Sequence, residues 1–188
     1  MIYFVAVIVS AVFGGVDQYL GSISAIPWLP EISLLSAPWL VLPFLFACSQ
    51  RTPRRAILIA CVATASALVA YFIMTLTPME NVHLNGSLGP VFALLHSEAH
   101  VIVGAAVTSP LYGYLGFRWR TQRAWISAVL VGGAICLEPL AAASVGRLPQ
   151  FPEVWGAQIA IGLLVSGYFI WRGTHYRREL GARALEGR

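Results

Sequence analysis

Long apolar runs alternate with short polar turns along this sequence. A helix needs about 20 apolar residues to cross the hydrocarbon core of a bilayer. The second run is short and contains Pro38, which suits a first helical turn, and Pro43, which is expected to kink or end the helix. The pattern predicts an all-α polytopic membrane protein, a six-helix bundle with spans at about 2–20, 34–49, 56–76, 91–117, 124–145 and 154–171.

Arginine divides the connections between these spans into two kinds. Three Arg occur in each of 50–55 and 118–123 and five follow position 171, whereas 21–33 and 78–90 contain none and 146–153 contains only Arg147. Because Arg is retained on the cytoplasmic side, we expect both termini inside and the protein in the cytoplasmic (inner) membrane. The division predicts a transmembrane domain over 1–171 and a basic cytoplasmic tail over 172–188, which can form a helix on the inner leaflet.

The composition excludes other classes of protein. Apolar residues make up 58% of the chain and charged residues 11%, whereas soluble domains carry roughly 25% charged residues. A soluble globule of this size could not bury so much apolar surface. The net charge of +4 comes from Arg that fits the topology, so we expect a lipid bilayer as partner and no nucleic acid. The odd number of cysteines, without a CxxC pair, excludes a complete disulfide framework.

Three carboxylic acids, Asp17, Glu98 and Glu138, interrupt the apolar spans. A carboxylate at mid-bilayer costs roughly 2.5–3.5 kcal/mol on insertion scales. In the predicted topology all three lie within about 10 Å of the outer edge of the core, at 1.5 Å per residue. We therefore predict a shared polar cavity in which at least one acid is protonated and acts as a proton donor. The alternative is structural: Asp17 is wetted or caps a helix, and the two Glu bind neighbouring helices.

Local motifs bear on the chemistry of Glu138. Pro139 has no N–H for the carbonyl of Ile135, which predicts an unpaired acceptor beside this acid and either a pocket or an ordinary kink. An aromatic wall could stabilise a cation in such a pocket. The candidates for substrate binding are the internal aromatic residues Phe13, Tyr71, Phe92, Tyr112 and Tyr168, with packing or lipid contact as their alternative role.

The cluster around Glu98 argues against a metal site. His96 and His100 share one helical face, whereas Glu98 lies about 200° around the helix from His96. One helix therefore cannot turn all three toward one ion, although a second helix could complete a two-His site. The sequence contains no glycine-rich phosphate loop and no aspartate-rich diphosphate motif. We expect no metal and no cofactor.

The order of several features resembles a small family of six-span bacterial membrane proteins that includes indole-terpenoid (sesquiterpene) cyclases. The resembling features are GGVD at 14–17, SAPWL at 36–40, the following Arg turn, Glu98, and Glu138 with Pro139. The resemblance implies that an acid protonates an alkene or epoxide of an apolar prenylated indole, which closes through carbocations without metal. Glu98 or Glu138 would then be the donor, and Asp17 an orienting or charge-stabilising partner.

Two other functions fit the same residues. A small-solute transporter or capture subunit would use an outward-facing acidic cavity for an organic cation or a vitamin. A non-catalytic assembly partner would use the acids only to join helices.

Overall fold

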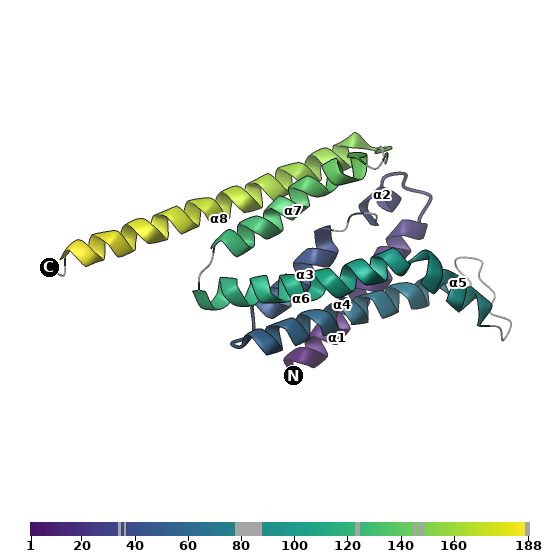
Figure 1. Ribbon diagram of the computed structural model, residues 1–188. Helices are drawn as coiled ribbons and strands as arrows, with labels where there is room; N and C mark the ends of the chain where they lie inside the picture. Colours follow the sequence, from purple (N-terminus) through teal and green to yellow (C-terminus); the bar gives the residue numbers. More distant parts are fainter. Residues whose placement is uncertain are drawn as a thin grey trace.

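The computed structural model describes residues 1–33, 35, 37–77, 88–122, 125–144, 146 and 149–186, without the side chains of 122 and 173–186. Within these residues all the regular secondary structure is helical, and short turns connect the helices (Figure 1). The helices are α1 (Ile2–Ser22), α2 (Leu29–Ser33), α3 (Ala37–Ala47), α4 (Pro53–Thr75), α5 (Gly89–Ser97), α6 (Ala99–Gln122), α7 (Trp125–Ser144) and α8 (Pro152–Glu186).

Four of these helices are long and apolar enough to cross a membrane: α1, α4, α7 and the part of α8 from Pro152 to Arg172. The pair α5 and α6 is a fifth candidate, bent by 58° at its break. Large apolar side chains cover their outer faces, and Leu164 is 73% exposed. A contiguous apolar surface of this extent indicates contact with lipid. The all-helical membrane class predicted from the sequence is therefore confirmed.

Two of the six predicted spans differ from the structure. The predicted span at 34–49 is an 11-residue helix, α3, whose length of about 16 Å covers half of the hydrocarbon core. Pro43 lies inside this helix and does not end it. The predicted span at 91–117 is broken at Glu98, which ends α5 as its C-cap while its own carbonyl accepts from the N–H groups of Val101 and Ile102 in α6.

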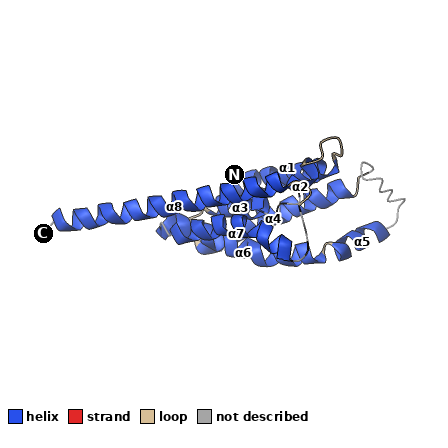
Figure 2. Ribbon diagram, turned by 90° about the horizontal axis from the view of Figure 1, so that it is seen from above, coloured by secondary structure: helices blue, strands red, loops and turns tan. Residues whose placement is uncertain are grey.

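Small residues bring the helices together in two groups. α1, α3, α4 and α6 form one group, and α7 and α8 form an antiparallel pair beside it (Figures 1 and 2). The backbone of Gly14 in α1 lies against Ala67 of α4 with no room for a Cβ atom. Gly132 of α7 faces Gly162 of α8 at a similarly close approach. Such small residues allow helices to pack tightly in a bilayer, where apolar surface alone provides no driving force.

The arginine-rich turns gather at one end of the bundle. α1 and α4 run parallel. The Tyr3 hydroxyl near the start of α1 donates to the carbonyl of Arg55 near the start of α4 at 3.5 Å, and further along both helices Gly14 packs on Ala67. The ends of α3 and α6 also lie together, with Gly116 against the backbone of Phe44. In Figure 1 the N-terminus, the α3–α4 turn and the α6–α7 connection lie at this end, while α2 and α5 lie at the other.

Candidate functional site

The first turn of α3 contacts two of the three predicted acids. Glu138 of α7 accepts a hydrogen bond at Oε2 from the backbone N–H of Ala37, at 2.8 Å. Asp17 of α1 accepts one at Oδ2 from the indole Nε1 of Trp39, at 3.2 Å. The first N–H groups of a helix have no partner within the helix, and its N-terminus carries a partial positive charge. A carboxyl group here satisfies a donor that would otherwise lie unpaired inside the bundle.

Gln158 of α8 completes the surroundings of Glu138. Its Nε2 donates to Glu138 Oε2 at 2.6 Å and to the carbonyl of Ile135 at 3.2 Å. This carbonyl is the acceptor that Pro139 was predicted to leave unpaired, and the structure pairs it with an amide from the next helix. Gln158 is 4% exposed, and its buried Oε1 has no hydrogen-bond partner in the part of the chain that the structure describes.

Glu31 of α2 is a second buried acid that the sequence did not single out. Its Oε1 accepts from the N–H of Gln150 at 3.1 Å and its Oε2 from the N–H of Phe151 at 2.9 Å. These residues directly precede α8, so the carboxyl group caps the start of that helix, where the dipole favours negative charge. Glu31 joins α2 to the α7–α8 pair.

Two cavities adjoin these groups between α2–α3 and α7–α8. The smaller, of about 420 Å³, is lined by Glu31, Glu138 and Trp155 among others, and is named here the carboxylate cavity. The larger, of about 810 Å³, is an open apolar groove lined by residues such as Val41 and Ile161. Leu35 and Gln158 line both. The two cavities therefore adjoin at these side chains.

Asp17 lies in a different environment, among aromatic rings. Trp39 makes edge-to-face contacts with Phe13 at 5.3 Å and with Tyr71 at 5.9 Å between ring centroids. Asp17 is 7% exposed and lines neither of the two cavities. The structure thus brings the predicted residues Phe13 and Tyr71 together around Trp39, the hydrogen-bond donor to Asp17.

Glu98 lies apart from the other two acids. It is half-exposed at the bend between α5 and α6, and it lines neither cavity. α5 diverges from the bundle beyond this bend (Figure 2). His96 and His100 are both exposed. The expectation of one cavity shared by all three acids therefore does not describe these two cavities, because only Glu138 of the three lines either of them.

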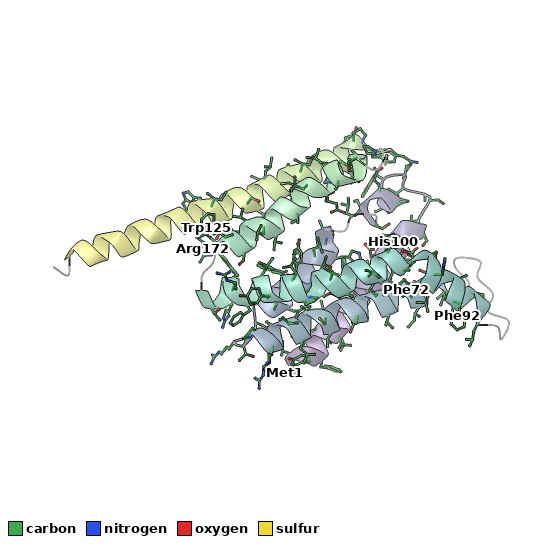
Figure 3. All side chains as sticks on the ribbon, in the orientation of Figure 1. Met1, Phe72, Phe92, His100, Trp125 and Arg172 are labelled. Atoms are coloured by element: carbon green, nitrogen blue, oxygen red, sulfur yellow. The ribbon has the colours of Figure 1, made fainter. Side chains whose placement is uncertain are left out.

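The remaining predicted aromatic residues are divided between the site and the surface. Tyr112 is buried against Ala37 and Ile135 and interacts electrostatically with Glu138. Phe92 is 67% exposed on α5 (Figure 3). Tyr168 is half-exposed near the opposite end, where its hydroxyl accepts from Arg172 Nη1 at 3.3 Å. Only Tyr112 of these three is placed to influence Glu138.

No family model, curated protein or solved structure matches this chain. The resemblance to indole-terpenoid cyclases therefore stays a prediction, and the site must be interpreted from its own geometry.

Proposed function

We propose that this protein is a membrane-bound, metal-independent terpene cyclase in which Glu138 protonates an alkene or epoxide of an apolar prenylated substrate. The observation that carries the proposal is the pair of donors on Glu138 Oε2, the N–H of Ala37 and the amide of Gln158. Donors fixed on one oxygen stabilise the carboxylate that remains after the proton leaves.

The apolar groove offers a place for the prenyl chain. Its volume of about 810 Å³ falls within the range of roughly 300–1,000 Å³ that is common for small-molecule sites. Ala37 and Gln158, the two residues that donate to Glu138, also line the groove. A lipid-soluble substrate would reach it from the bilayer, because the outer faces of the helices are apolar.

The proposed reaction is an isomerisation. The proton of Glu138 forms a C–H bond at one alkene carbon, or opens the epoxide, and leaves a carbocation. The π electrons of a neighbouring double bond then form the ring C–C bond. A proton returns from the final cation to the carboxylate and creates the product double bond, and the restored acid exchanges this proton with solvent before the next turnover. Tyr112 belongs to the buried cluster that includes Ala37 and Ile135, two residues that line the groove.

We also propose six membrane segments with both termini in the cytoplasm. The parallel course of α1 and α4 requires the chain between them to return, and α3 is the helix that does so. α3 would then be a half-length crossing that begins inside the bilayer, with α2 and the acids filling the outer half. The grouping of the Arg turns at one end supports this orientation.

The test is conversion of farnesyl-indole by the purified protein in detergent micelles made with deuterium oxide. We expect an isomeric product that carries deuterium from the solvent at the protonated carbon. Glu138→Gln should lower turnover at least about 100-fold, the lower end of the effect of a general acid. Glu98→Gln is the matched control and should retain turnover, with both variants checked for folding by size-exclusion chromatography. Absence of product from the wild type, or undiminished turnover of Glu138→Gln, would refute the proposal.

A carrier or capture subunit for an organic cation is the second candidate function. One observation favours it, which is that Glu31 and Glu138 line the same cavity. Uptake of a labelled organic cation into proteoliposomes, lost in Glu31→Gln, would support a carrier. Retained uptake in that variant would count against it.

A further inference from the structure

The carboxylate cavity contains groups that the proposed cyclisation does not use. Both oxygens of Glu31 accept hydrogen bonds from backbone N–H groups, which are neutral donors and leave the negative charge in place. Among the lining residues that the structure describes there is no Arg, Lys or His. The carboxyl group of Glu31 therefore has no cationic partner among the described residues of this cavity.

The lining also offers few hydrogen-bond donors. Three prolines, Pro27, Pro30 and Pro139, form part of the wall and have no backbone N–H. The Trp155 side chain lines the same cavity and carries a π face that attracts cations. Carboxyl acceptors and a π face suit a positively charged ligand that brings its own N–H groups.

Gln158 adds an independent sign of a ligand. Its Nε2 donates to Ile135 and to Glu138, so the amide cannot flip without losing both bonds. Oε1 is thereby fixed as an acceptor, and among the described residues it has no hydrogen-bond partner although Gln158 is 96% buried. Buried acceptors are almost always paired, so this oxygen needs a donor that the described part of the chain does not supply.

We propose that the carboxylate cavity binds a primary or secondary ammonium group. The charge of the ammonium is met by Glu31, and one of its N–H bonds reaches Oε1 of Gln158. The ammonium belongs either to a free amine or to the headgroup of a lipid, whose chain would then lie in the adjoining groove beyond Leu35. This site goes beyond the proposed cyclisation and does not depend on proton transfer from Glu138.

The test compares two ligands of the same skeleton on the wild-type protein in phosphatidylcholine nanodiscs. The probes are 2-phenylethylammonium and its N-trimethyl analogue, with binding measured by calorimetry. A second arm uses native mass spectrometry to count retained phosphatidylethanolamine against phosphatidylcholine. We expect an N–H-bearing ammonium to bind at least tenfold tighter than its trimethyl partner in one arm. Selectivity in the first arm identifies a free amine, and selectivity in the second alone identifies a lipid headgroup. Equal affinity within both pairs overturns the proposal.

Variants locate the binding to this cavity. Glu31→Gln should weaken binding of the selected ammonium at least tenfold, and Gln158→Met should abolish the preference over the trimethyl partner. Glu153→Gln is the matched control, because Glu153 lines the groove but not the carboxylate cavity, and its binding should stay unchanged. Unchanged binding in Glu31→Gln overturns the site.

Arg147 provides the remaining test, since it is three positions from Gln150 in the sequence and lies outside the described residues. If the ammonium binds only to Arg147→Gln and not to the wild type, the cavity holds the chain's own guanidinium and the proposal fails. Because these experiments measure binding, their outcome is separate from the turnover of farnesyl-indole.

Discussion

Asp17 and Glu138 both meet the first turn of α3, yet their surroundings differ. Asp17 is buried and accepts one described side-chain bond, from the indole of Trp39, whose ring packs against Phe13 and Tyr71. Glu138 accepts from two amides and borders a cavity. The lesson is that the depth of an acid in a span does not decide its role. The neighbours decide whether the acid anchors packing or is open to a ligand.

The helix interfaces behind the two acids differ in the same way. In α1 and α4 behind Asp17, the hydroxyls of Ser10 and Thr64 are buried and have no hydrogen-bond partner among the described residues. Beside Glu138, the contact between α3 and α7–α8 leaves the groove and the carboxylate cavity open. Changes at the first interface should therefore affect stability, and changes at the second should affect ligands as well.

The largest expected effect is at the tight interface. Gly14→Ala places a Cβ atom against the backbone of Ala67, which cannot move away as a flexible side chain could. We expect a loss of about 3 kcal/mol in the free energy of unfolding, the upper part of the range for overpacking. The measurement is unfolding in mixed micelles. Gly104→Ala is the matched control, because nothing lies within 4 Å of its added methyl group, and similar losses in both variants would contradict the packing described.

A smaller effect separates the two acids. Glu138→Leu leaves the N–H of Ala37 and the amide of Gln158 without their acceptor, whereas Glu138→Gln keeps one. We expect the leucine variant to be less stable than the glutamine variant by about 2 kcal/mol, the cost of unsatisfied buried donors. For Asp17→Leu against Asp17→Asn the difference should be about half as large, because only the Trp39 indole loses its partner. Equal differences at both positions would mean that Glu138 and Asp17 satisfy their hydrogen-bond donors to the same extent.

Trp39→Phe tests how much the hydrogen bond from the indole to Asp17 contributes to stability. Phenylalanine keeps an aromatic ring against Phe13 and Tyr71 but lacks the indole N–H. The expected loss is about 1 kcal/mol, the net value of one hydrogen bond, measured by thermal unfolding in detergent. Trp28→Phe serves as control on the half-exposed wall of the groove and should change stability by less than about 0.5 kcal/mol. A neutral Trp39→Phe would mean that the bond to Asp17 contributes nothing.

The smallest effect is expected at Glu98. Its side chain is half-exposed at the bend, so Glu98→Gln should change the free energy of unfolding by less than about 0.5 kcal/mol. Chemical unfolding in the same micelles provides the measurement. A loss above about 1 kcal/mol would place Glu98 with the buried acids and restore the cavity predicted from the sequence.

Hydrophobicity and proline were enough to predict part of this molecule. The helical membrane class follows from apolar run length, and the free carbonyl of Ile135 follows from Pro139, because both depend on local chemistry. The break at Glu98 could not be predicted, since no proline or glycine lies at this point of the sequence.

The partners of Glu138 were harder to predict than the acid itself. Gln158 is a polar residue inside an apolar span, which is the same signal that singled out the acids, but its meaning depends on α8 lying beside α7. Glu31 lies in a short connection where an acidic residue is unremarkable in sequence, and only the fold brings it to the start of α8. Likewise Phe13 and Tyr71 meet through Trp39, whereas Phe92 and Tyr168 remain on the surface.

The length of α8 has a mechanical consequence. From Pro152 to Glu186 it is one helix, and in Figure 1 it extends well past the rest of the bundle at the arginine-rich end. Gln158 and Arg177 are therefore carried on a single rod, about 28 Å apart at 1.5 Å per residue. A torque applied to the basic end would turn the amide against its acceptors on α7, with no intervening joint to absorb it.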